Sequence, residues 1–212
     1  MKAFCITLGL LAITFMSFRT PSGYLEIMQE NIQQLYEAQA IEELQSVVNA
    51  FTRIAQAEQK EWHPLYYAAF GNIMMSSRAE ATSVKDQYLD QAEELVKQAN
   101  ERVEKESELK ALEGFVQMMR VAVDPAGRGP QYSGLATQTL SRAVQMDPKN
   151  PRALTLLAQM EMGTARFFGS EPAEACAKLD KAIALFGNDQ PEHPLDPAWG
   201  LESARAAKQQ CP

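Results

Sequence analysis

The chain has 212 residues, of which 46% are hydrophobic and 22% are charged, a composition that supports one globular domain with a real core. Its formal net charge is -7. Nucleic-acid binders usually carry a basic field or stripe, so this acidic chain, which has neither, is not expected to bind DNA or RNA.

The N-terminal residues differ from the rest of the chain. A short basic start precedes an apolar run at residues 3–18, which is typical of a signal peptide and is short for a membrane-spanning helix, since such a helix needs roughly 20 apolar residues. Small residues at Thr20 and Ser22 predict cleavage after residue 22. We therefore expect a signal peptide at 1–22, a mature domain at 23–212 without a membrane span, and an exported, periplasmic protein; an uncleaved, membrane-tethered form is the alternative.

Beyond the signal peptide, apolar residues recur at intervals of three and four, as in Leu44, Val47, Val48 and Phe51, which predicts helices with one apolar stripe. No stretch shows sustained period-two alternation, so we expect no sheet. The predicted helices form four pairs and a terminal helix: 24–37 with 39–58, 61–76 with 84–102, 105–122 with 132–146, 151–165 with 172–186, and finally 198–209.

Proline and glycine mark the breaks between these helices. Residues 125–130 (PAGRGP) are predicted to be a loop. In the turn at 147–151, Asn150 is expected to cap the next helix and Pro151 to occupy its first position. Another turn is expected at 169–172, and an extended connector at 187–197, where three prolines occur.

The second half of the chain contains an internal repeat. A small–large–small spacing occurs in one predicted helix and recurs in a later one, in the residues Ala136, Leu140, Ala143 and Ala175, Leu179, Ala182. Pro148 ends the first of these helices, because proline cannot continue the hydrogen-bond ladder. Small residues allow two helices to approach closely, and the large residue fills the gap between them.

This pattern resembles the tetratricopeptide repeat (TPR) family, and further first-helix matches occur at Leu154, Leu157 and Ala158. The chain also looks like a group of exported bacterial TPR proteins of unassigned activity. The resemblance is best over 135–186; Gly187 departs from it, because it stands near the place of the closing proline. It implies an all-α, right-handed α-solenoid of about four antiparallel helix pairs with a C-terminal capping helix.

Candidate catalytic groups are sparse. The only histidines, His63 and His193, have no triad or HExxH motif around them, and we interpret them as solvent-exposed helix-end or loop residues instead of acid–base or metal groups. The adjacent acidic pairs on helices do not share a face and so form no carboxylate dyad. There is no CxxC motif and no Cys/His cluster in the sequence, so we expect no enzyme, no cofactor and no metal site.

In a TPR stack the first helices line the concave side, where family members usually hold peptides. Carried over to this chain, the resemblance implies partner-binding residues at Lys60, His63, Tyr67, Phe70, Arg152, Thr155, Gln159 and Met162. Arg152 is singled out because a guanidinium can grip a carboxylate with two hydrogen bonds; the favoured alternative is a surface salt bridge or a contact to the preceding loop. For Tyr67 and Phe70, a place in the core is the favoured alternative.

The sequence allows two interpretations for each of two features near the C-terminus. Cys176 and Cys211 are an even pair in a predicted exported protein, consistent with a disulfide or with two free, buried thiols. The aromatic residues Phe167, Phe168 and Trp199 are interpreted as capping the open end of the stack, with an exposed docking patch as the alternative.

We therefore expect a non-catalytic scaffold that binds a protein or peptide partner on its concave face. The alternatives are a structural subunit that assembles through its ends and a small helical hydrolase. The identity of the partner, the pathway and the oligomeric state are not indicated by the sequence.

Overall fold

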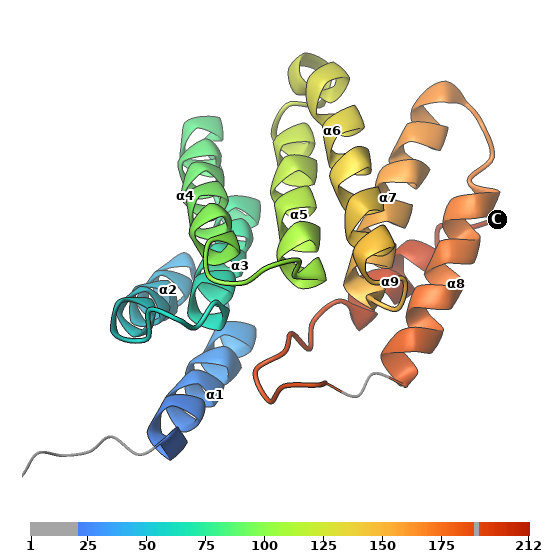
Figure 1. Ribbon diagram of the computed structural model, residues 1–212. Helices are drawn as coiled ribbons and strands as arrows, with labels where there is room; N and C mark the ends of the chain where they lie inside the picture. The colour runs from blue at the N-terminus through green and yellow to red at the C-terminus, as the bar shows by residue number, and fades with distance from the viewer. Residues whose placement is uncertain (1–20, 189–190) are drawn as a thin grey trace, which may run out of the picture.

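The computed structural model describes residues 21–188 and 191–212, which contain nine α-helices and no strand (Figure 1). The helices are α1 (Pro21–Glu37), α2 (Ile41–Ala57), α3 (His63–Arg78), α4 (Thr82–Asn100), α5 (Ser107–Val123), α6 (Pro125–Met146), α7 (Pro151–Phe168), α8 (Ala173–Gly187) and α9 (Leu201–Lys208). None of the helices in this described part is long and apolar enough to cross a membrane. The predicted signal peptide at 1–22 lies outside the described residues, apart from its last two positions, which begin α1.

The helices pack as successive antiparallel pairs, α1 with α2 through α7 with α8, placed side by side (Figure 1). Each first helix also packs against the first helix of the next pair, so that α1, α3, α5 and α7 form one layer. The predicted all-α, solenoid-like fold is confirmed, whereas its handedness stays a prediction. Because α9 packs on both α7 and α8, it occupies the place that the first helix of a fifth pair would take.

Close helix approach depends on small residues, as the repeat pattern predicted. A Cβ atom added to Gly71 of α3 would lie 2.5 Å from Val48 of α2. Likewise, a Cβ atom on Gly114 of α5 would lie 2.5 Å from the Leu140 side chain of α6. Leu140 and its small neighbours of the predicted repeat are completely buried. Side chains larger than hydrogen at these two glycines would therefore push the paired helices apart.

The prediction of a loop at 125–130 was wrong, because α6 begins at Pro125. Asp124 caps this helix by accepting a 3.0 Å hydrogen bond from the Gly127 N–H, and Pro125 fits the first position, where no amide donor is needed. Arg128 then holds the first turns against α4 through two hydrogen bonds to Asp86, of 2.5 and 2.7 Å. Capping and this ion pair outweigh the unfavourable Pro130 inside the helix.

Other helix ends follow the local capping chemistry. Asn150 caps α7 as predicted, accepting a 2.8 Å hydrogen bond from the Ala153 N–H. The helix continues to Phe168, three residues beyond the predicted end, and stops at Gly169, whose φ of 66° is readily adopted only by glycine. The last helix begins at Leu201, not at residue 198, because residues 191–200 are not helical. The connector predicted to be extended contains a turn, closed by a 2.9 Å hydrogen bond from the Asp196 N–H to the His193 carbonyl.

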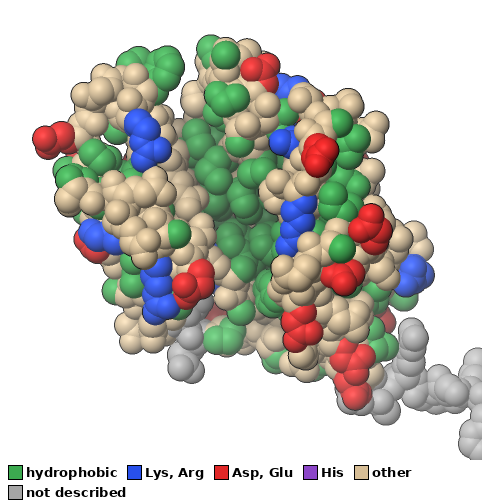
Figure 2. All heavy atoms as spheres, turned by 180° about the vertical axis from the view of Figure 1, so that it is seen from behind, with side chains coloured by type: hydrophobic (Ala, Val, Ile, Leu, Met, Phe, Trp, Pro, Cys, Tyr) green, Lys and Arg blue, Asp and Glu red, His purple; other side chains and the backbone are tan. Residues whose placement is uncertain are grey.

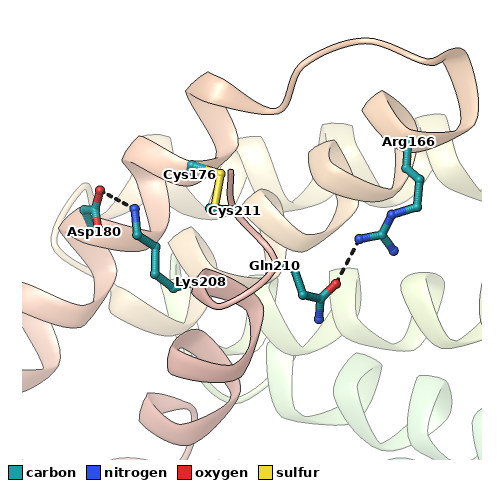
Figure 3. The surroundings of a disulfide bond; sticks show 6 residues. All are labelled: Arg166, Cys176, Asp180, Lys208, Gln210 and Cys211. Carbon is teal, nitrogen blue, oxygen red and sulfur yellow. Dashed lines mark hydrogen bonds and ion pairs between the residues drawn. A yellow bond between two sulfur atoms is a disulfide. The ribbon is translucent and has the colours of Figure 1, made fainter.

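A disulfide bond joins Cys176 of α8 to Cys211, with the two Cα atoms 6.0 Å apart (Figure 3). The cross-link that the sequence left open is therefore present. An ion pair of 2.7 Å between Lys208 and Asp180 ties α9 to the same helix. Together these contacts fix the C-terminal segment to the last helix pair, which confirms the predicted capping helix.

Candidate functional site

The non-helical connector, defined here as residues 191–200, does not pass directly from α8 to α9. It runs along the ends of the first helices as far as α1 and α3 and then returns to α9 (Figure 1). The Tyr67 hydroxyl of α3 donates a 2.8 Å hydrogen bond to the Leu195 carbonyl, and Leu195 is completely buried. Burial raises the pKa of Tyr67 far above its usual value, so this hydroxyl stays protonated and able to donate. The connector is therefore a packed part of the domain.

Trp199 anchors the end of the connector in the layer of first helices. Its ring stacks on Phe70 of α3, with centroids 4.8 Å apart, and on Phe115 of α5, with centroids 5.7 Å apart. Its indole N–H donates a 2.9 Å hydrogen bond to the hydroxyl oxygen of Tyr66. Trp199 is half-buried, and these contacts pack its ring against both neighbours and satisfy its single polar group.

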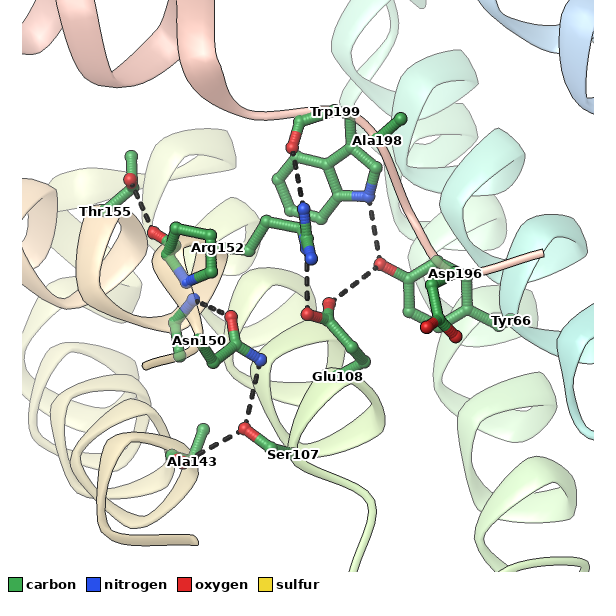
Figure 4. Close-up of polar contacts among 12 residues, drawn as sticks. Tyr66, Ser107, Glu108, Ala143, Asn150, Arg152, Thr155, Asp196, Ala198 and Trp199 are labelled. Carbon is green, nitrogen blue, oxygen red and sulfur yellow. Dashed lines mark hydrogen bonds and ion pairs between the residues drawn. The ribbon is translucent and has the colours of Figure 1, made fainter. Parts of the chain in front are cut away.

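A closed polar network surrounds this anchor (Figure 4). The Tyr66 hydroxyl contacts one carboxylate oxygen of Glu108 at 3.5 Å, and the Arg152 Nε donates to the other at 2.8 Å. The same guanidinium reaches the Trp199 carbonyl at 3.5 Å. Arg152 is only 4% exposed, so its ion pair with Glu108 is buried and is not the surface salt bridge expected as the alternative for this residue. The network links α3, α5 and α7 to the connector.

The concave face of the domain is hollowed. Figure 2 shows a hollow between two walls, lined mainly with hydrophobic side chains, with Lys and Arg side chains on the walls beside it. The connector therefore fills one part of the concave face and leaves another part accessible.

Helical spacing shows which side chains continue the faces that meet the connector. Residues three or four positions apart share a helix face, so Met74 continues the face of Phe70 on α3 and Met119 continues that of Phe115 on α5. Both methionines are half-buried against the core. On α7, Gly163 is exposed and lies about three turns beyond Arg152 on the same face, with nothing within 4 Å of an added Cβ atom.

The eight predicted partner-binding residues occupy three kinds of position. Lys60 is exposed in the turn before α3, and Gln159 is half-buried and donates a 2.9 Å hydrogen bond to Ser203 of α9. The remaining six are buried, five of them at the contact with the connector or in the core: His63, Tyr67, Phe70, Arg152 and Met162. The sixth, Thr155, donates to the Pro151 carbonyl of its own helix at 2.8 Å. Their part in binding a partner stays a prediction.

The C-terminal aromatic residues divide between the two interpretations weighed for them. Trp199 packs inside the domain, whereas Phe167 and Phe168 are 83% and 74% exposed at the end of α7. Their rings contact each other edge to face, with centroids 5.1 Å apart. These two phenylalanines therefore do not cap the stack and instead form a small exposed apolar patch.

The two histidines, far apart in the sequence, meet in the fold. The ring of His63, the first residue of α3, stacks on that of His193 in the connector with centroids 4.6 Å apart. Asp196 completes the group, with one oxygen 3.5 Å from the His63 Nε2. Burial, with a smaller effect of the neighbouring His193, lowers the pKa of His63 to about 4. The expectation that both histidines are solvent-exposed is wrong for His63, which is buried. Sequence spacing could not show this cluster, because it depends on the path of the connector.

Comparison with solved structures places the chain beside a protein of known role. It is similar to the HusA haemophore from Porphyromonas gingivalis, with 26% sequence identity, a TM-score of 0.79, and coverage of 89% of this chain and 92% of that one. A thermophilic TPR protein from Thermus thermophilus is a more distant match, at 15% identity and a TM-score of 0.42, over 88% of this chain and 97% of that one. No protein-family model matches the sequence. No curated protein matches it either.

Proposed function

We propose that this protein is a non-catalytic binding protein that holds a planar, largely apolar ligand of the haem class in the concave hollow. The observation that carries this proposal is the likeness to a haemophore over nearly the whole of both chains. At 26% identity and a TM-score of 0.79, the likeness extends to the arrangement of all helix pairs and not to one motif. The haem class of ligand and a role without catalysis are therefore proposed for this chain from its likeness to that haemophore.

The chemistry of the hollow fits such a ligand. A tetrapyrrole presents a broad apolar face and carries carboxylates at one edge. Small-molecule sites are concave and mainly apolar, with few polar groups, as the hollow in Figure 2 is. Half-buried Met119 and Phe115 offer polarisable thioether and aromatic contacts to a flat ring. The Lys and Arg side chains on the walls supply charges that would attract the carboxylate edge.

The compartment is part of the same proposal. Disulfides persist in oxidising compartments outside the cytosol, and the Cys176–Cys211 bond is consistent with export. The predicted signal peptide at 1–22 agrees with that placement. Residence in the periplasm, as opposed to release from the cell, stays a prediction.

The protein or peptide partner predicted from the TPR resemblance is the competing proposal for the same surface. An extended peptide would need hydrogen-bonding side chains along the first helices, and most of the predicted ones, including Arg152 and Tyr67, are engaged inside the domain. The open part of the hollow is instead mainly hydrophobic (Figure 2). The geometry therefore favours the small, flat ligand.

A spectroscopic titration with two matched variants tests the proposal. Gly163→Glu adds a carboxylate on the face of α7 that carries Arg152, in a place where an added Cβ atom meets nothing within 4 Å. Gly134→Glu is the control, because Gly134 is also exposed, helical and without neighbours within 4 Å of an added Cβ atom. Gly134 lies on α6, outside the layer formed by α1, α3, α5 and α7. Both changes remove a helical glycine, which stabilises a helix by roughly 0.5–1 kcal/mol, so neither should unfold the protein.

Ferric haem is added to each protein, and its absorbance and the quenching of tryptophan fluorescence are followed. We expect saturable one-to-one binding by the wild type and by Gly134→Glu. Binding by Gly163→Glu should weaken at least about tenfold, because the bound ligand would cover the added carboxylate. A loss of about 1.4 kcal/mol in binding free energy suffices for that factor. Absence of saturable binding by the wild type, or equal binding by both variants, would overturn the proposal.

A further inference from the structure

The histidine cluster at the start of α3 is separate from the hollow and has the composition of a metal site. One donor atom from each of His63, His193 and Asp196 lies within 4.8 Å of the other two. His63 comes from the first turn of α3, and the other two residues come from the connector. Two imidazoles and a carboxylate are a ligand set that divalent first-row transition metals favour.

His63 is buried without satisfying its polar atoms. It is 5% exposed, and neither ring nitrogen makes a hydrogen bond of good geometry among the described residues; the Asp196 oxygen 3.5 Å from Nε2 is a long ion-pair contact only. Trp62 stacks on the ring with centroids 4.0 Å apart, and His193 also stacks on it. Leaving a buried polar group unpaired costs about 1–3 kcal/mol, so a native structure normally supplies a partner.

The distances are close to those of a zinc site. For ligand atoms about 2.0–2.1 Å from a tetrahedral ion, the distance between two ligand atoms is about 3.3–3.5 Å. The His63 Nε2 and one oxygen of Asp196 are already 3.5 Å apart. The His193 ring lies on the connector, where rotation about its side-chain bonds can close the remaining distance. Such a rotation would replace the weak 3.2 Å hydrogen bond that its Nδ1 accepts from the Leu195 N–H.

The surroundings already orient the carboxylate. The second oxygen of Asp196 accepts a 2.8 Å hydrogen bond from the backbone N–H of His193, which leaves the first oxygen directed at the His63 ring. A pocket of about 770 Å³, lined in part by all three residues, opens beside the cluster. Three protein ligands with an open side match sites in which water completes the coordination.

We propose that His63, His193 and Asp196 bind one divalent transition-metal ion of the zinc class, which pins the connector to α3. The connector carries Leu195, bonded to Tyr67, and Trp199, which stacks in the layer of first helices. Metal binding therefore couples to the packing of the segment that completes the concave face. The site takes the free ion and is independent of the ligand proposed for the hollow.

Binding of Zn²⁺ to the tag-free, chelator-treated protein tests this site. Isothermal titration measures stoichiometry and affinity, and the visible spectrum with Co²⁺ reports tetrahedral coordination directly. His193→Ala and Asp196→Asn each remove one ligand. Glu192→Gln is the matched control, because Glu192 is exposed, lies on the same connector and lines the same pocket without belonging to the cluster.

We expect the wild type to bind one equivalent of Zn²⁺ with a rise in thermal melting temperature. The affinity of each ligand variant should fall at least tenfold, and that of Glu192→Gln should change less than threefold. Far-UV circular dichroism without metal checks that each variant remains folded. Absence of stoichiometric binding by the wild type, or affinity of His193→Ala and Asp196→Asn equal to that of Glu192→Gln, would overturn the proposal.

Discussion

Replacement of Trp199 by alanine should destabilise the whole domain, although this residue lies in a connector and not in a helix. The change removes two ring contacts, with Phe70 at 4.8 Å and with Phe115 at 5.7 Å, and a 2.9 Å hydrogen bond to Tyr66. Each aromatic contact adds about 0.5–1.5 kcal/mol beyond area burial, and the hydrogen bond about 1 kcal/mol. Because Trp199 is half-buried, the total should be about 2–4 kcal/mol, toward the lower side of the cost of truncating a tryptophan in a core.

Equilibrium unfolding in urea, followed by far-UV circular dichroism, measures this loss. Trp199→Phe separates the two contributions, because it keeps a ring between Phe70 and Phe115 but removes the donor to Tyr66. Its cost should be about 1–2 kcal/mol, mainly from the lost hydrogen bond. If Trp199→Ala unfolds within about 0.5 kcal/mol of the wild type, the ordinary range for surface changes, the connector is not packed as described.

Three further outcomes are expected. Replacing both Cys176 and Cys211 by serine opens a link across 35 residues and should lower the free energy of unfolding by about 4 kcal/mol, measured in urea without reductant. Glu108→Ala removes the carboxylate 2.8 Å from the buried Arg152 guanidinium and should cost about 3–5 kcal/mol in the same assay; a loss below about 1 kcal/mol would contradict the buried network. The pKa of His63 is about 4 in the folded protein and 6.5 in the reference state, so the unfolded chain takes up its proton first as the pH falls. Stability should therefore decline by about 3 kcal/mol between pH 6.5 and pH 4 in the presence of chelator, and His63→Asn should flatten that decline.

Much of the fold could be predicted because its determinants are local. Apolar spacing marks each helix, Asn150 marks the start of α7, and the small–large–small pattern around Leu140 marks close helix pairing. The same local reasoning failed at residues 125–130. Proline and glycine in that segment usually break a helix. In this fold the Asp124 cap and the Arg128–Asp86 ion pair stabilise a helix there instead.

The candidate sites were less accessible to prediction, because they depend on the path of the connector. Tyr67, Phe70 and Arg152 were correctly placed on first helices, but the sequence does not show that the connector covers them. The meeting of His63 and His193 is likewise set by tertiary packing and by no spacing in the chain. The hollow itself is what the connector leaves uncovered.

Hydrogen–deuterium exchange with and without ferric haem locates the proposed ligand on the chain. We expect slower exchange in the C-terminal halves of α3, α5 and α7, and unchanged exchange in α2 and α4, which lie outside the layer of first helices. Protection confined to helices outside that layer, or no protection at saturating haem, would contradict the proposal.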